Sequence, residues 1–309
     1  MWDHPNAVVL VAAGNDGANG PNTVGSPATN KNGVAVGASS NAEESWEQRG
    51  ITRGTDFYNM DSLAWFSSRG PTADDRLKPD VCAPGEILLA GMVTSRVLIF
   101  LRYFSSFVVG YMVRGAKALY PVTGMRHCDV TVDMGTSFSS PILASHTALV
   151  REYFMSGFYP SGERNPVDGF EPSGALLKAV LIHGGKGLEH IQAETEEEMT
   201  PMTHGDNNQG YGRTQLDKSL SFKVNATLDG LTYFVIGAAD NSSNHYAALS
   251  SGDDPHVYTF RTADRGSLKP IRVTLAYTVR ISAHNNFAPH SVIVFITTGV
   301  VCHYLRLNI

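Results

Sequence analysis

Two short apolar runs near the start of the chain have the pattern of strands buried on both faces. Residues 7–13 read AVVLVAA and residues 33–39 read GVAVGAS, and turn-forming Gly, Asn and Pro bound both runs. Unbroken apolar runs of this length are typical of a parallel α/β sheet. The Gly-, Asn- and Pro-rich stretch 16–32 is then the loop that joins the two strands.

Two further segments have the signals of buried helices. Residues 141–155 follow a Ser-Ser-Pro sequence, and proline favours the first turn, so we expect a helix that begins at Pro141. Its apolar positions, Ile142, Leu143, Leu149, Val150 and Phe154, suit burial. Residues 173–182 form the second predicted helix, with Ser173 as its N-cap and glycines at 184 and 185 after its end.

The pattern changes near residue 220. Short β-rich runs at 222–227, 232–236, 256–261 and 271–277 are separated by clusters of turn residues. This rhythm is typical of an antiparallel β-sandwich. We therefore predict an α/β domain over 1–220, with a parallel sheet flanked by helices, and a jelly-roll-like β-sandwich domain over 221–309. The rhythm is lost after residue 279, so we expect an incomplete sandwich with an atypical tail.

Composition narrows the class of protein. The chain is 42% hydrophobic and 17% charged, which excludes a disordered chain or a disulfide scaffold. A net charge of −5 does not favour a nucleic-acid partner. Cys82, Cys128 and Cys302 form no CxxC pair and have no histidine at metal-ligand spacing, so we predict no metal site of that kind.

Neither a leader nor a membrane span is predicted. The first residues lack a basic segment followed by a long apolar one, so they do not form a signal peptide. The apolar run 97–113 is too short to cross a bilayer as a helix and contains Arg102 at its centre. We therefore expect no membrane partner.

Residues 135–141, GTSFSSP, are the first candidate for chemistry. A nucleophilic serine needs an exposed hydroxyl at a sharp turn, and a helix N-terminus places N–H groups beside a developing oxyanion. Gly135 permits the turn, and Ser137 is the candidate nucleophile. Taken alone, the motif also fits a serine-rich helix cap.

Residues 12–15, AAGN, are the second candidate. Asn15 follows the first predicted strand, at the edge where ligands approach an open α/β sheet. A carboxamide there can donate a hydrogen bond, although an asparagine in a turn is more often structural.

Together these segments resemble the subtilisin family of serine peptidases. The order LVAAGNDG, TVGSPATNKNGVAVGAS, FSSRGPT, KPDVCAPG, GTSFSSP and GYGRTQLDKSL is that of the family, and it covers roughly residues 5 to 220. The resemblance implies that Ser137 is the nucleophile and that the Asn15 side chain and the Ser137 N–H stabilise the oxyanion. It also places Gly14 and Gly25 at the substrate, with Gly25 at the base of the S1 pocket. The region after 220 resembles the C-terminal β-domain of some subtilases.

The chain departs from the family at three places. The catalytic Asp and His motifs of the family precede the oxyanion asparagine, and residues 1–14 contain neither. His127, His146 and His183 are weak substitutes as a base; without one, a serine is a poor nucleophile. Residues 91–126 interrupt the family pattern with a largely apolar segment, which we interpret as an insertion foreign to the fold. Together with the atypical tail, these departures indicate an interior slice of a longer protease.

The leading interpretation is a subtilisin-like serine endopeptidase that cleaves polypeptides, with this chain inactive on its own. The alternatives are a non-catalytic protein that uses the subtilase scaffold for binding, and a structural or carbohydrate-binding sandwich. The resemblance implies secretion and requires no cofactor. Calcium often stabilises subtilases as a structural ion, with Asp16, Asn19, Asn22, Asp206 and Asn207 as loop candidates, but the spacing matches no defined calcium loop.

Overall fold

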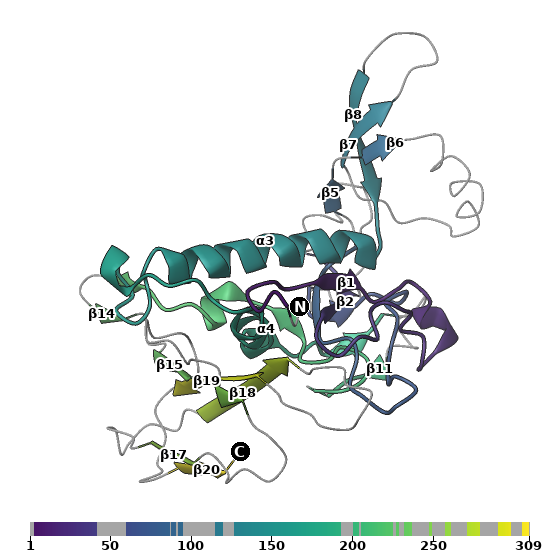
Figure 1. Ribbon diagram of the computed structural model, residues 1–309. Helices are drawn as coiled ribbons and strands as arrows, with labels where there is room; N and C mark the ends of the chain where they lie inside the picture. Colours follow the sequence, from purple (N-terminus) through teal and green to yellow (C-terminus); the bar gives the residue numbers. More distant parts are fainter. Residues whose placement is uncertain are drawn as a thin grey trace.

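The computed structural model describes residues 3–41, 60–86, 134–192, 200–203, 205–223 and 272–278 with their side chains. Elsewhere it gives strands alone, by their bounds and pairing. The first part of the chain builds a sheet against which two helices pack, and a smaller sheet extends away from it (Figure 1).

The main sheet has eight strands in the order β11-β10-β3-β2-β4-β12-β9, with β1 beside β2. Its centre is parallel, through the pairs β1–β2, β2–β4 and β4–β12. The antiparallel pairs β2–β3, β9–β12 and β10–β11 make the sheet mixed, where we expected a parallel one. Each of these pairs includes a two-residue strand, too short to leave a hydrophobic pattern. The strands are β1 (Leu10–Ala12), β2 (Val34–Ser39), β3 (Ser62–Leu63), β4 (Val81–Pro84), β9 (Gly185–Lys186), β10 (His190–Ile191), β11 (Thr200–Pro201) and β12 (Arg213–Thr214).

The two predicted helices are present, but one begins earlier than expected. Helix α4 (Gly174–His183) has Ser173 as its N-cap, and the serine hydroxyl accepts a hydrogen bond from the Leu176 N–H at 3.1 Å. Helix α3 (Thr136–Met155) starts five residues before Pro141, so the prediction that Pro141 opens the helix is wrong. Inside the helix, Pro141 offers no N–H to the carbonyl of Ser137, and that backbone bond is missing from the first turn.

Both helices cover one face of the sheet. Val34 and Val36 of β2 pack in one cluster with Leu143 of α3 and Leu181 of α4. Ala35, which points the other way, packs instead with loop residues that include Val24. Residues at the far end of α3 then pack on α4 and on Ala276 of β18. Three 3₁₀ turns complete the described part: Gly17–Asn19, Pro166–Asp168 and Leu216–Lys218.

The segment between β4 and α3 forms a separate sheet. Strands β5 (Leu88–Ala90), β6 (Met92–Thr94), β7 (Gly115–Leu119) and β8 (His127–Asp133) pair in the order β5-β8-β7-β6, away from the main sheet (Figure 1). The two ends of this segment lie close together, because the Gly135 N–H donates to the Gly85 carbonyl at 2.8 Å. Most of the expected insertion, 91–126, lies outside the described residues, so its foreign origin stays a prediction.

The region after residue 220 is antiparallel in every pair that the structure gives. The expected strand 232–236 is confirmed as β15 (Thr232–Ile236), and β13 (Lys223–Val224), β17 (Val257–Phe260) and β18 (Ile271–Thr278) match the other three runs. Further strands are β14 (Thr227–Leu228), β16 (Ala247–Ala248), β19 (His290–Thr297) and β20 (Leu305–Asn308). The assembly of these strands into a sandwich domain stays a prediction.

The tail after residue 279 contains strands, and its atypical character stays a prediction. Strand β19 lies in this tail and pairs with β15, β16 and β18. Its sequence HSVIVFIT is rich in β-branched and aromatic residues, which suits a strand with neighbours on both edges.

Across the described helices, none has the length and apolar character needed to span a bilayer.

Candidate active site

Ser137 is the second residue of helix α3 and is exposed to solvent. Within a helix, an N–H at this position has no acceptor, so the backbone N–H of Ser137 is available to a ligand. The preceding Gly135 has φ +148°, a conformation that side-chain-bearing residues rarely adopt. A Cβ there would also lie 3.3 Å from Nδ2 of Asn15. The backbone of Gly135 therefore favours glycine, and a Cβ at this position would also crowd the Asn15 carboxamide.

The side chain of Asn15 reaches the start of α3 from the end of β1. Its Oδ1 accepts hydrogen bonds from the Thr136 N–H at 2.9 Å and from the Thr136 hydroxyl at 3.0 Å. Because the Thr136 N–H can only donate, the atom facing it is the oxygen of the carboxamide. The Nδ2 donor of the exposed Asn15 is thereby left on the other side of the group. Asn15 thus caps α3 from a distant part of the chain, since Gly135 has no side chain to do so.

Thr136 is a site residue that the sequence analysis did not single out. Its hydroxyl donates to Asn15 and accepts a hydrogen bond from the Gly14 N–H at 3.2 Å. The threonine therefore fixes both the carboxamide and the backbone that carries it. The only signal in the sequence was its position between Gly135 and Ser137.

The loop after β1 is held by the segment that contains Ser68. The Gly14 carbonyl accepts from the Ser68 N–H at 3.0 Å, and the Ser68 hydroxyl accepts from the Asp16 N–H at 3.0 Å. Gly14 has φ +115°, and a Cβ on it would lie 2.7 Å from the Ser68 hydroxyl. These contacts fix Asn15 at the turn and leave no room for a side chain at position 14.

Gly25 lies beside the same strand end, because its N–H donates to the Ala13 carbonyl at 3.2 Å. It is exposed, and a Cβ on it would meet nothing within 4 Å. The structure thus brings Asn15 together with the turn before Ser137, and Gly14 and Gly25 next to the strand that carries Asn15. Open space above Gly25 could take part of a ligand.

Of the three candidate bases, the two whose side chains the structure describes, His146 and His183, make no hydrogen bond to Ser137. Nδ1 of the buried His183 lies 2.8 Å from the Thr274 hydroxyl, and burial, with the nearby charge of Arg272, lowers the pKa of His183 to about 3. His146 lies half-buried on α3, and burial lowers its pKa as well. Both are therefore neutral imidazoles in the packing of the helices. The side chain of His127 lies outside the described residues.

The predicted calcium loops are held by their own hydrogen bonds. The carboxylate of Asp206 accepts from the N–H groups of Thr203, Asn208 and Gln209. Among the described side chains, no three His, Cys, Asp or Glu residues converge as they would around a metal ion. A structural calcium ion stays a prediction.

Comparison with known proteins identifies the family of the chain. The profile of the subtilase family of peptidases matches residues 1–212. Two curated relatives are Dictyostelium discoideum "Serine protease/ABC transporter B family" proteins. Protein tagB is 32% identical over 132 residues and tagD is 30% identical over 133 residues. Each match covers 43% of this chain and 6% of the relative, so the chain spans a small part of their length.

Two solved structures also show likeness to the chain. The Prenylagaramide maturation protease PagA is 16% identical with a TM-score of 0.35, and the match covers 69% of this chain and 50% of that one. The S41 Psychrophilic Protease is 19% identical with a TM-score of 0.32, over 67% of this chain and 47% of that one.

Proposed function

Because the chain belongs to the subtilase family, a family of serine peptidases, we propose that it carries the nucleophile half of a subtilisin-like endopeptidase site. The Ser137 hydroxyl would attack the carbonyl carbon of a peptide bond while a base accepts its proton. The peptide would then break to release an amine and leave an acyl-enzyme, which water hydrolyses. Polypeptides are the substrates, and secretion follows from the family as a further expectation.

The observation that carries the proposal is the contact between Asn15 and Thr136. With its oxygen held by the Thr136 N–H and hydroxyl, the carboxamide is oriented before any substrate binds. Its Nδ2 and the Ser137 N–H would then donate to the oxyanion formed at the substrate carbonyl. Donors held in place in this way need no reorganisation when the charge develops. The N-terminal end of the 20-residue helix α3 adds a favourable dipole at the same point.

The base is the component that the described residues do not provide. No described imidazole is hydrogen-bonded to Ser137, and residues 1–14 contain neither family motif. In a subtilisin, loss of the histidine costs about as much in kcat as loss of the serine, roughly 10⁶. Chain 1–309 is therefore expected to be inactive by itself. The alternative, a subtilase scaffold used only for binding, is favoured by this same feature.

Labelling with a fluorophosphonate separates the two functions. We expect no labelling of chain 1–309. The same chain, extended by the coding sequence immediately upstream of Met1 in its gene, should be labelled if that sequence supplies the Asp and His motifs. The label should disappear in Ser137→Ala. Labelling of chain 1–309 itself would contradict the predicted inactivity. If an extended, folded chain carries both motifs and resists labelling, Ser137 is not the nucleophile. If the upstream sequence lacks the Asp and His motifs, the non-catalytic binding function is favoured.

A further inference from the structure

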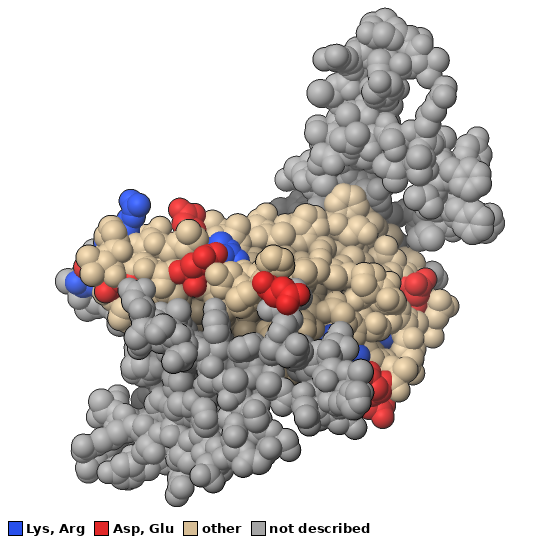
Figure 2. Space-filling view, in the orientation of Figure 1, with Lys and Arg blue, Asp and Glu red and all other residues tan. Residues whose placement is uncertain are grey.

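A cavity lies between helix α4, the segment before β4 and strand β18, and it shares no residue with the Ser137 site. Its volume is about 520 Å³, within the range common for small-molecule sites. Of its eleven lining residues, four are basic and only Asp80 is acidic. On the face drawn in Figure 2, charged side chains are instead scattered singly or in small groups of either sign. The cavity thus differs from that face of the molecule in having an excess of cations.

Asp80 and Lys178 form an ion pair, and their other polar atoms are hydrogen-bonded to neighbouring parts of the fold. Asp80 Oδ1 lies 2.9 Å from Lys178 Nζ, while Oδ2 accepts from Lys78 Nζ at 2.5 Å and from the Ala35 N–H at 2.7 Å. Lys178 also donates to the carbonyls of Gly33 and Lys31. An ammonium group has three hydrogens, so Lys178 has none left for a ligand. These two residues form the structural floor of the cavity.

The basic side chains of the cavity outnumber its acids. Asp80 is the single acid of the lining, and Lys78 and Lys178 share its one negative charge, so Asp80 cannot neutralise all four cations. Burial lowers the pKa of Lys78, and Asp80 opposes this effect only in part. Arg76 does bond Asp74, through Nε alone in the described structure, and that acid is exposed and does not line the cavity. An anion in the cavity would relieve the repulsion among these groups and stabilise the charged form of Lys78.

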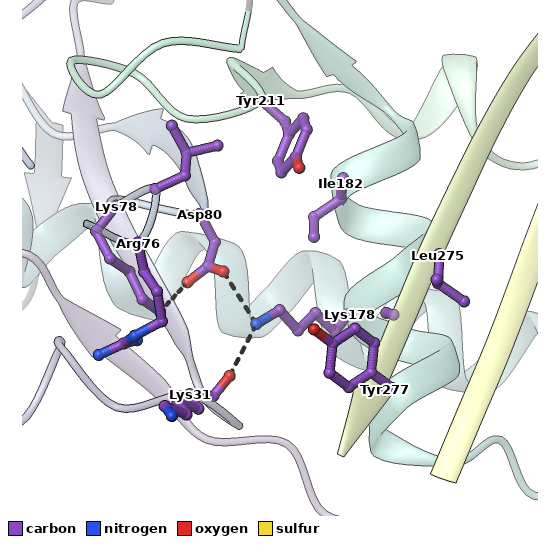
Figure 3. A pocket seen from close by; sticks show the side chains of 11 residues that line it. Lys31, Arg76, Lys78, Asp80, Lys178, Ile182, Tyr211, Leu275 and Tyr277 are labelled. Atoms are coloured by element: carbon purple, nitrogen blue, oxygen red, sulfur yellow. Dashed lines mark hydrogen bonds and ion pairs between the residues drawn. The ribbon is translucent and has the colours of Figure 1, made fainter. Parts of the chain in front are cut away.

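The side of the cavity that faces Arg76 and Lys31 carries apolar side chains and the rings of tyrosines. Figure 3 shows Arg76 and Lys31 on one side and Leu275 and Tyr277 on the other. The phenol of Tyr211 has a raised pKa because of burial, with Asp80 and Tyr277 adding to the effect, so it remains a hydrogen-bond donor at neutral pH. The cavity therefore combines cations, a neutral donor and an apolar wall.

From this arrangement we propose that the cavity binds a small ligand with a carboxylate or phosphate group attached to an apolar body. The anionic group would lie against Lys31, Arg76 and Lys78, and the body against Ile182, Leu275 and Tyr277. Charge-assisted hydrogen bonds to the anion supply specificity, and burial of the body adds affinity. Because β18 follows the predicted domain boundary, such a ligand would touch both predicted domains and join them.

Isothermal titration calorimetry of chain 1–309 tests the proposal with four probes: phenyl phosphate, 3-phenylpropionate, inorganic phosphate and the neutral 3-phenylpropan-1-ol. We expect binding of at least one aromatic anion and none of the alcohol. The preferred aromatic anion identifies the anionic group. The affinity should fall as salt is raised, because the contacts are electrostatic. Absence of binding by both aromatic anions, or equal binding of the alcohol, would overturn the proposal.

Variants locate the bound probe. Lys31→Gln combined with Arg76→Gln should weaken binding of the aromatic anion about tenfold or more, which is a change of about 1.4 kcal/mol. The matched control, Arg164→Gln with Lys218→Gln, removes the same charge from exposed positions outside the cavity and should change nothing. Leu275→Ala should weaken the aromatic anions but not inorganic phosphate. Ser137→Ala should bind as the parent does, which keeps this test independent of the proposed catalysis. Equal affinities for the cavity and control double variants would refute the site.

Discussion

Helices α3 and α4 pack on the same face of the sheet but use polar contacts for opposite purposes. At the start of α3, neutral hydrogen bonds between Asn15 and Thr136 lie next to the exposed Ser137 and leave donors facing solvent. Along α4, Lys178 bonds the buried Asp80 and His183 bonds the buried Thr274, so that polar groups are consumed inside the fold. The first arrangement is suited to a ligand or substrate, and the second fixes a helix in the core.

The largest effect on stability is expected at Asp80. In Asp80→Asn, Lys78 and Lys178 would lose the charge that both contact, and breaking a buried pair typically costs about 3–5 kcal/mol. Urea unfolding followed by circular dichroism measures the free energy of unfolding. The control is Asp74→Asn, which breaks an exposed ion pair with Arg76 and should leave the unfolding midpoint unchanged. Equal effects of the two substitutions would show that α4 does not depend on this contact.

The next effect concerns activity and tests the α3 side of the comparison. Asn15→Asp keeps an oxygen to accept from the Thr136 N–H but removes the Nδ2 donor. In the extended, active form of the chain, we expect kcat to fall about 10²–10³, the magnitude known for removing such a donor in a subtilisin itself. The unfolding midpoint should stay near that of the parent, because a carboxylate at a helix N-terminus is favourable. Unchanged kcat in a folded variant would remove Asn15 from the proposed oxyanion site.

A smaller effect should appear in the pH dependence of stability. The pKa of His183 is about 3 in the folded chain, against 6.5 as its ordinary value, so the unfolded chain takes up the proton first as the pH falls. The stabilisation is fully present above about pH 6.5 and should be lost progressively below it, by at most about 1.4 kcal/mol per pH unit. His183→Asn should flatten this slope between pH 6.5 and 5. His4→Asn, at an exposed position, should not, and identical slopes for parent and His183→Asn would contradict the assignment.

The α4 side of the comparison was largely predictable from sequence, and the α3 side was not. Ser173 and the glycines after the helix placed α4 within one residue, because its caps are local in the chain. The start of α3 was misplaced because its cap comes from Asn15, which lies far away in sequence and contacts Thr136 through the tertiary fold. The preference of proline for the first turn of a helix gives no information about a cap from a distant part of the chain.

The sequence identified the residues of the site, but it did not indicate how these residues contact one another. Ser137 and Asn15 were identified from motifs, and the structure brings Asn15 to the turn before Ser137. Thr136, which orients the carboxamide, left no separate signal. The cavity beside α4 left no signal either, because its cations come from three separate places in the chain and meet only through the packing of α4 and β18. The two-residue strands were not predicted, because strands of that length show no alternation of apolar and polar residues.

The hydrogen bond between the Gly135 N–H and the Gly85 carbonyl has a consequence for how this chain can change during evolution. It joins the start and the end of the segment that carries β5 to β8 at one point, beside the turn before Ser137. The entropy of closing a flexible loop grows only with the logarithm of its length, at about 0.6 kcal/mol for each doubling. A flexible insertion between the strands of this segment would therefore cost little free energy, and the position of Ser137 would be inherited unaltered.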